Sequence, residues 1–230
     1  GLFKVKVYLL DTTYRYLTTK PQMRLLFLSN TRDNTNKEVI KQLRSWIKTD
    51  EKIAYFSASP DPSRKYFLEI AEWFKNIVGL PNLYYLDTNS TAHEINGLRD
   101  AAAVFLSGGN TYHLLQALRD TGAGELIHKL ATTTEIPIIG VSAGGICLTR
   151  DIRAARDEND IGVTNHKGLG LVDFGFYPHH VPEETRQAEI YSFIKLSDID
   201  EVLALPDYSG IVVTENGPLF LGEIIRFTKQ

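Results

Sequence analysis

The chain has 230 residues, of which 43% are apolar and 23% are charged, as is typical of a globular protein with a sizeable core. Its net charge of −3 excludes the strongly basic footprint of a nucleic-acid-binding protein. No apolar run approaches the roughly 20 residues that cross a bilayer, so no membrane partner is expected. The single cysteine, Cys147, excludes an internal disulfide and indicates a reducing cytoplasm.

The first two thirds of the chain alternate strand-like apolar runs with helical segments. The helical segments carry apolar residues at three- and four-residue intervals, whereas the strand-like runs are short and continuous. The predicted strands are 4–10, 24–29, 53–57, 83–86, 103–106 and 136–141, and the predicted helices are 34–48, 63–78, 94–100, 111–121 and 124–132. This alternation predicts an α/β fold, with a mostly parallel sheet covered by helices on both faces.

The remaining third of the chain does not continue this regular alternation of strands and helices. A charged segment, 150–160, is typical of a loop, and it is followed by a predicted strand at 169–177 and a predicted helix at 183–194. Short strands at 202–205, 211–214 and 219–227 are separated by turns, which favours antiparallel strands that close the edge of the sheet. No repeat or linker interrupts the chain, so residues 1–230 are interpreted as a single domain.

A tight glycine-rich turn follows the apolar run 136–141. The residues Gly140-Val141-Ser142-Ala143-Gly144 match the G-x-S-x-G nucleophile elbow in a strand–turn–helix setting. Small neighbours let the helix and the strand approach closely, which leaves the serine hydroxyl exposed above the sheet. The N–H of Ala143 can then point at a developing oxyanion. The alternative is a glycine-rich β–α turn with an unremarkable serine.

A serine hydroxyl is a poor nucleophile until a base takes its proton. His179 and His180 follow a predicted strand and Pro178, at a strand end where catalytic side chains of α/β sheets gather. The alternative is a pair of loop histidines. A carboxylate usually orients such a base, and spacing does not choose among the acidic residues between Ser142 and the histidines, which are Asp151, Asp157, Glu158, Asp160 and Asp173.

A second glycine turn, Ser107-Gly108-Gly109-Asn110-Thr111, follows the predicted strand 103–106. Asn110 or Thr111 can cap the next helix, and the turn presents bare backbone N–H groups at its start. Such a turn suits an oxyanion, a carboxylate or a phosphate. It matches neither the Walker A pattern nor G-x-G-x-x-G, so the sequence does not favour a nucleotide cofactor.

Taken together, the motifs of the chain between about residue 103 and about residue 194 resemble those of the S51 serine peptidases. That family contains dipeptidase E, an alpha-aspartyl dipeptidase, and the cyanophycinases. The resemblance implies a three-layer sandwich of the class I glutamine amidotransferase-like or flavodoxin-like type. It is carried by the segments Ser-Gly-Gly-Asn-Thr (107–111), Gly-Val-Ser-Ala-Gly (140–144), Leu-Gly-Leu-Val-Asp-Phe (169–174), Pro-His (178–179) and Glu-Thr-Arg (184–186).

The resemblance also implies the members of a catalytic triad. Ser142 would be the nucleophile and His179 the general base. Asp157, which lies between them in the chain, matches the third member best, although Glu158 and Asp160 are close alternatives.

Further roles are implied for the groups that hold the substrate. The N–H groups of Gly109 and Ala143 would form the oxyanion hole, and Asn110 would contact the substrate. Arg186 would hold the side-chain carboxylate of an N-terminal aspartate as a bidentate clamp. Alternatively, Arg186 is an exposed helix residue that pairs with Glu183 or Glu189.

The function implied is hydrolysis of short peptides, above all dipeptides with N-terminal aspartate, through an acyl-enzyme. No metal or organic cofactor is expected, and the expected partner is a small peptide, with a homodimer as the candidate assembly. The alternatives are a cyanophycinase-like hydrolase of aspartyl polymers, an esterase of the α/β-hydrolase type, and a non-catalytic binding domain on the same scaffold.

Overall fold

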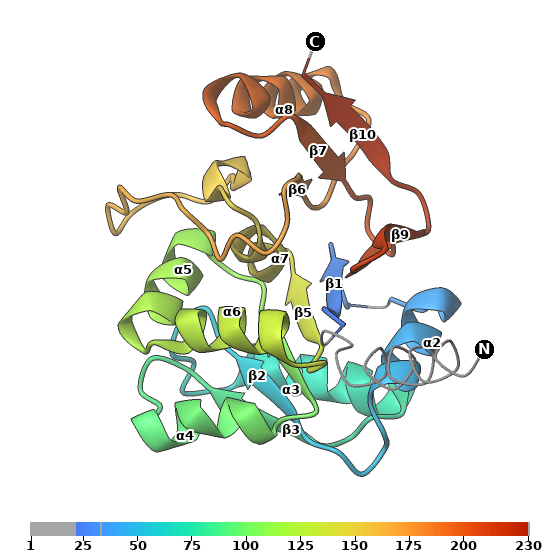
Figure 1. The fold of residues 1–230 in the computed structure, drawn as a ribbon, viewed down its shortest axis with the longest axis vertical. Coiled ribbons are helices and arrows are strands. Elements are labelled where there is room, and N and C mark those ends of the chain that lie inside the picture. The colour runs from blue at the N-terminus through green and yellow to red at the C-terminus, as the bar shows by residue number, and fades with distance from the viewer. Residues whose placement is uncertain (1–21, 33, 230) are drawn as a thin grey trace, which may run out of the picture.

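The structure, a computed structural model, describes residues 22–32 and 34–229 and is built around one large sheet (Figure 1). The predicted strand 4–10 lies outside the described residues. Strand order is β3-β2-β4-β5-β1-β8-β9, in which the first five strands are parallel and the last two are antiparallel. The strands are β1 (Leu25–Leu28), β2 (Ile53–Phe56), β3 (Leu83–Leu86), β4 (Ala103–Leu106), β5 (Ile138–Val141), β8 (Gly210–Thr214) and β9 (Gly217–Leu221).

Helices cover both faces of this sheet, as the sequence predicts. Strand β1 shows why its sequence is apolar throughout, because Leu25 and Phe27 face one core and Leu26 and Leu28 face the other. The first core also holds side chains of α4 (Ala92–Asn96), η2 (Gly97–Asp100), α5 (Thr111–Asp120), α6 (Ala123–Thr133) and α7 (Ala143–Leu148). The second holds those of α2 (Lys37–Trp46), α3 (Lys65–Trp73) and η1 (Phe74–Val78). None of the helices described has both the length and the apolar character needed to cross a membrane.

A second, smaller sheet is present that the sequence does not predict. It has the order β10-β7-β6, made of β6 (Gly175–Tyr177), β7 (Glu201–Ala204) and β10 (Ile225–Thr228), and α8 (Glu184–Leu196) packs beside it (Figure 1). The expectation that all the C-terminal strands close the main sheet is therefore wrong, since only β8 and β9 do so. The expected strand 219–227 is broken because Gly222, at φ 112°, turns the chain between the two sheets.

The expected strand 169–177 is also shorter in the structure. The N–H groups of Leu169 and Leu171 donate to the carbonyls of Cys147 and Leu148 at the end of α7, and Val172 forms only an isolated bridge with Thr149. Only Gly175–Tyr177 pairs as a strand. The charged segment before it forms a loop with one short turn, η3 (Ile152–Ala154).

Two glycines allow α7 to pack directly on the backbone of the sheet. A Cβ atom on Gly144 would lie 2.8 Å from the carbonyl carbon of Leu106 in β4. A Cβ atom on Gly140 would lie 2.7 Å from the backbone of Gly144 and Gly145. Atoms cannot approach this closely, so the elbow requires glycine at both positions.

We expect Gly144→Ala to lower the free energy of unfolding by about 3 kcal/mol, because the methyl group overlaps backbone that cannot move aside. Gly97→Ala is the matched control, since φ at Gly97 is −61° and nothing lies within 4 Å of an added Cβ. This control should change stability by less than about 1 kcal/mol. Urea unfolding of both variants checks the difference, and equal midpoints would contradict the close approach.

A buried histidine gives the fold a dependence on pH. His180 is 5% exposed, and its ring lies between those of Tyr177 and Phe227. Burial lowers the pKa of His180 from its ordinary 6.5, with the nearby Arg186 acting in the same direction and Glu223 against it. The unfolded chain therefore binds a proton in a pH range where the folded chain keeps His180 neutral.

We expect the free energy of unfolding to fall as the pH drops from about 7 to about 5, because protonation of His180 then favours the unfolded state. His180→Phe, which suits the aromatic surroundings, should flatten this slope. Replacement of the exposed His128 by Gln should leave the slope unchanged. Urea unfolding at several pH values measures it, and an unaltered slope in His180→Phe would refute the assignment.

Candidate active site

Four parallel strands end in serine at the same edge of the main sheet. Ser29, Ser57, Ser107 and Ser142 directly follow β1, β2, β4 and β5, which are neighbours in the order β2-β4-β5-β1. Carboxyl ends of parallel strands are where α/β folds place their functional groups. Three of these hydroxyls donate to backbone carbonyls, namely those of Leu205, Ser59 and Gly108. Ser142 Oγ instead faces an imidazole.

The backbone of Ser142 has a conformation that side chains rarely adopt. Its φ of 51° and ψ of −112° lie outside the ordinary regions for a non-glycine residue. The Ser142 N–H donates to the Leu28 carbonyl at 2.9 Å, and the Ser142 carbonyl accepts from Ile146 at 3.0 Å in α7. Such strain costs about 1–3 kcal/mol and persists only where the surroundings enforce it. The turn has the conformation expected of a nucleophile elbow.

The second sheet brings a histidine and an aspartate to this serine. Strands β6 and β7 are parallel, and Tyr177 pairs with Ala204. The chain continues as Pro178-His179 after β6 and as Leu205-Pro206-Asp207 after β7, so both side chains leave the same edge. His179 Nε2 lies 3.0 Å from Ser142 Oγ, and His179 Nδ1 lies 2.8 Å from Asp207 Oδ1. Hydroxyl, imidazole and carboxylate therefore form one hydrogen-bonded chain.

Asp157 does not occupy the position expected from the sequence. Its carboxylate accepts hydrogen bonds from the N–H and the hydroxyl of Thr111, the first residue of α5. Asp160 likewise contacts His113 of α5, at 2.8 Å. Carboxylates are stabilised at a helix N-terminus by the helix dipole, which accounts for the acidic character of this loop. The expected placement of Asp157 beside His179 is thus wrong, and Asp207 stands there.

His179 and Asp207 stand in the same local sequence pattern, which could have drawn attention to Asp207. His179 follows an apolar strand and a proline, and Asp207 follows another apolar strand and a proline. Asp207 lies beyond His179 in the chain, outside the interval from which the acidic member is expected. The parallel pairing of β6 with β7 skips over the whole of α8, so spacing along the chain does not indicate that Asp207 lies beside His179.

The turn that contains Gly109 lies against the serine. A Cβ atom on Gly108 would lie 3.7 Å from Ser142 Cβ, and Gly109 has a φ of 118°, which favours glycine. Ser107 Oγ fixes the turn by accepting from the Ala58 N–H and donating to the Gly108 carbonyl, both at 2.9 Å. Ala143 directly follows Ser142 in the chain and is the first residue of α7. The structure thus brings together the segments that carry both expected oxyanion-hole groups.

Asn110 caps a helix in the structure. Its Oδ1 accepts from the N–H groups of Tyr112 and His113 at the start of α5. Its Nδ2 donates to the Glu158 carbonyl at 2.8 Å, which ties the acidic loop to this helix. The side chain of Asn110 therefore holds the glycine turn in place, and Glu158 contributes a backbone carbonyl to the same contact.

Arg186 is paired with Glu189 of its own helix and with Glu183, which directly precedes that helix. Its Nη1 lies 3.4 Å from Glu189, and its Nε lies 3.9 Å from Glu183. The Tyr177 hydroxyl also donates to Glu189. This hydrogen bond, together with Arg186, holds the pKa of Glu189 below its ordinary value. The arrangement matches the alternative in which Arg186 is a helix residue with acidic partners.

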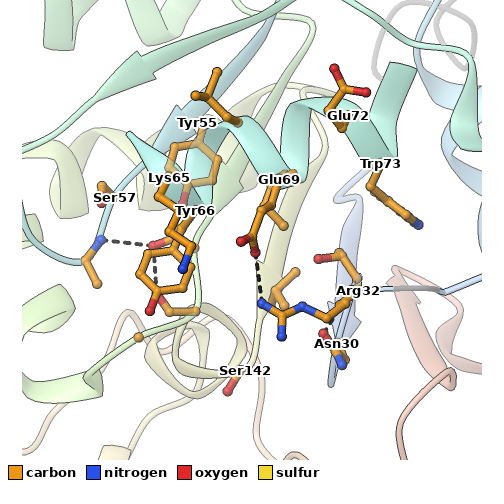
Figure 2. A pocket seen from close by; sticks show the side chains of 18 of the residues that line it. Asn30, Arg32, Tyr55, Ser57, Lys65, Tyr66, Glu69, Glu72, Trp73 and Ser142 are labelled. Atoms are coloured by element: carbon orange, nitrogen blue, oxygen red, sulfur yellow. Dashed lines mark hydrogen bonds and ion pairs between the residues drawn. The ribbon is translucent and has the colours of Figure 1, made fainter. Parts of the chain in front are cut away.

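A large cavity opens beside the serine. It has a volume of about 1340 Å³ and is lined by Ser142, His179, the glycine turn and one side of α3. Figure 2 shows Lys65, Tyr66 and Glu69 projecting from α3 into this space, with Ser142 at its far side. Such a concave site, with a hydrogen-bonded serine at its base, is suited to binding a small molecule or a peptide.

Two cationic side chains line the cavity. Arg32 donates to Glu69 at 2.9 Å across it (Figure 2), and both side chains are largely exposed. Lys65 forms no ion pair with any residue in the described part of the chain. An ammonium group that lines the cavity without an acidic partner attracts a carboxylate on a bound ligand.

Comparisons with known proteins identify the family of this chain. The sequence profile of peptidase family S51 matches residues 25–219. The chain is 29% identical over 214 residues to Peptidase E of Nostoc sp., covering 86% of each chain. It is 31% identical over 134 residues to the "Probable alpha-aspartyl dipeptidase" of Drosophila melanogaster, covering 55% of each. The fold matches a crystal structure of a peptidase from an acI-B1 actinobacterium, with a TM-score of 0.67, 12% identity, and coverage of 93% of this chain and 97% of that one. The chain belongs to peptidase family S51.

Proposed function

We propose that this peptidase uses Ser142 as a nucleophile to hydrolyse short peptides, preferably dipeptides with N-terminal aspartate. The observation that carries the proposal is the hydrogen-bonded chain from Ser142 through His179 to Asp207 at the wall of a large cavity. Membership of family S51 supports peptide hydrolysis. The preference for aspartate is supported by the name of the Drosophila relative and by the cations in the cavity.

The first half of the reaction is acylation. Ser142 Oγ attacks the peptide carbonyl carbon while its proton passes to His179 Nε2, and the carbonyl oxygen becomes an oxyanion. The N–H groups of Ala143 and Gly109 would stabilise that charge. The C–N bond then breaks, His179 gives its proton to the leaving amine, and the acyl group stays on Ser142 as an ester.

The second half repeats these steps with water. His179 takes a proton from the water as the water attacks the ester carbonyl, and then returns a proton to Ser142 Oγ as the acid product leaves. Throughout, Asp207 accepts the hydrogen bond from Nδ1–H, which fixes the tautomer of the imidazole and stabilises the imidazolium. Asp207, in place of Asp157, is therefore the proposed third member of the triad.

The size of the cavity favours longer aspartyl peptides as a second candidate class of substrate. Its 1340 Å³ exceeds the roughly 300–1,000 Å³ of sites that bind drug-sized molecules. Longer aspartyl peptides could therefore extend along α3. Cleavage of oligo-aspartyl chains without cleavage of any dipeptide would favour this candidate.

We also place the enzyme in the cytoplasm, with a small peptide as its partner and no nucleic acid. The cysteine content supports this placement, because the single cysteine, Cys147, is buried and cannot form a disulfide within the chain. The net charge of −3 supports the absence of a nucleic-acid partner.

Three single variants test the proposed triad. Ser142→Ala should abolish hydrolysis of an aspartyl chromogenic amide and of a panel of X-Leu dipeptides. Asp207→Asn should lower kcat by about a hundredfold or more, because the imidazole loses its orienting acceptor. Asp157→Asn, the matched control, should leave kcat within about tenfold, because Asp157 caps α5 and does not touch His179. Steady-state kinetics decide, and an equal loss in the two aspartate variants would overturn the assignment of Asp207.

A second pair of variants tests which cation holds the aspartyl carboxylate. We expect Lys65→Met to raise KM for aspartyl substrates by about tenfold, the cost of one charge-assisted hydrogen bond, and to leave alanyl substrates unchanged. Arg186→Met should leave both KM values nearly unchanged, because Arg186 is paired with Glu183 and Glu189. A raised KM for aspartyl substrates in Arg186→Met, with no change in Lys65→Met, would instead identify Arg186 as the group that holds the aspartyl carboxylate.

A further inference from the structure

The hydroxyl of Ser29 lies where three segments of the site meet. Ser29 is fully buried and directly follows β1, whose last residue, Leu28, pairs with Val141 beside the nucleophile. Its Oγ donates to the Leu205 carbonyl at 2.8 Å and accepts from the His179 N–H at 3.2 Å. One oxygen atom thus links the main sheet to both loops that carry the other members of the proposed triad.

The backbone of His179 has a strained conformation that its hydrogen bond to Ser29 helps to hold in place. Its φ of 55° is left-handed, a conformation that is uncommon for residues other than glycine. A strained conformation persists only where the surroundings enforce it. The N–H of His179 is held by Ser29 Oγ, and the next N–H, that of His180, donates to Leu205 at 2.8 Å. Loss of the hydroxyl leaves the His179 N–H without this acceptor, and the strain can then relax.

The same hydroxyl also holds the loop of Asp207. The Leu205 carbonyl, two residues before Asp207, accepts from both Ser29 Oγ and the His180 N–H. The Leu205 N–H in turn donates to Tyr177, two residues before His179, at 2.9 Å. The distance of 2.8 Å between His179 Nδ1 and Asp207 is therefore set by backbone that Ser29 ties to the main sheet.

We propose that Ser29 is a positioning residue, whose hydroxyl fixes His179 and Asp207 relative to Ser142. This inference rests on the proposed function, because Ser29 acts through the triad and does not itself touch the reacting atoms. It predicts that loss of the hydroxyl slows the chemical step and leaves substrate binding almost intact.

The chain offers a matched control for a buried serine. Ser197 is 7% exposed, and its Oγ donates to the Phe193 carbonyl at 2.7 Å and accepts from the Ile199 N–H at 3.4 Å. Both serines thus bridge a carbonyl and an N–H of the backbone. Ser197 follows α8 and lies outside the described lining of the cavity.

The experiment compares Ser29→Ala with Ser197→Ala in the full chain. Both variants should show similar, modest drops in melting temperature. Only Ser29→Ala should lower kcat, by about ten- to a hundredfold, with KM within about threefold, because misplacement by about an ångström has costs of this order. Ser29→Thr, which keeps the hydroxyl, should recover most of the rate. Equal kcat losses in the two alanine variants would overturn the proposal.

Two further readouts need no peptide substrate, so they separate this proposal from the proposed function. The rate of labelling by a fluorophosphonate should fall in Ser29→Ala and stay constant in Ser197→Ala. The proton on Nδ1 of His179, when hydrogen-bonded to Asp207, should give a far-downfield NMR signal that Ser29→Ala weakens. If the wild type cleaves no peptide, these readouts still test the positioning role of Ser29. An unchanged labelling rate together with an unchanged NMR signal in Ser29→Ala would overturn that role.

A double-mutant cycle tests whether Ser29 acts through the triad. In an Asp207→Asn background, Ser29→Ala should lower the labelling rate by much less than it does in the wild type, because the orienting contact is already lost. Fully additive effects would show that Ser29 acts elsewhere, and would overturn the inference.

Discussion

The site depends on the hydrogen bond between Ser142 Oγ and His179 Nε2, because this contact joins groups carried by two different sheets. Ser142 and His179 have positive φ values of 51° and 55°, so the backbone is strained at both residues that form the hydrogen bond. The free energy that holds them comes from outside the site, from strands such as β1 and β5 that are buried on both faces. The large apolar core therefore keeps two unfavourable conformations in place, and the active geometry follows from them.

The four serines at the strand ends differ in what their hydroxyl groups contact, which supports Ser142 as the proposed nucleophile. Ser29, Ser57 and Ser107 have the same chemistry as Ser142, yet each donates its proton to a carbonyl. A hydroxyl that donates to a carbonyl directs its proton at that carbonyl and not at a base. Ser142 differs because the glycines around it permit the sharp turn that directs its Oγ toward His179. Residue type is thus shared among the four, and local conformation decides which hydroxyl faces the imidazole.

Much of the fold and part of the site could be predicted from the sequence, because those features are local. Alternating apolar runs indicate the parallel sheet, and the elbow motif and Pro178 point to Ser142 and His179. The second sheet could not be predicted in this way, since the pairing of β6 with β7 joins segments separated by α8. Asp207 could not be predicted for the same reason, and the resemblance to the S51 peptidases implied Asp157 in its place. The dipole of α5 explains why that acidic loop lies where it does.

The hydrogen-bonded serine, histidine and aspartate and one wall of the cavity come from different parts of the fold. The serine, the histidine and the aspartate follow strands whose positions are fixed by the backbone hydrogen bonds of two sheets. The cavity beyond them is lined in part by side chains of α3, among them Lys65 and Glu69, which are exposed. Changes on that face alter charge and shape without disturbing the strand ends. Under the proposed function, the strand ends would carry the chemistry, whereas the face of α3 would contribute to the choice of substrate.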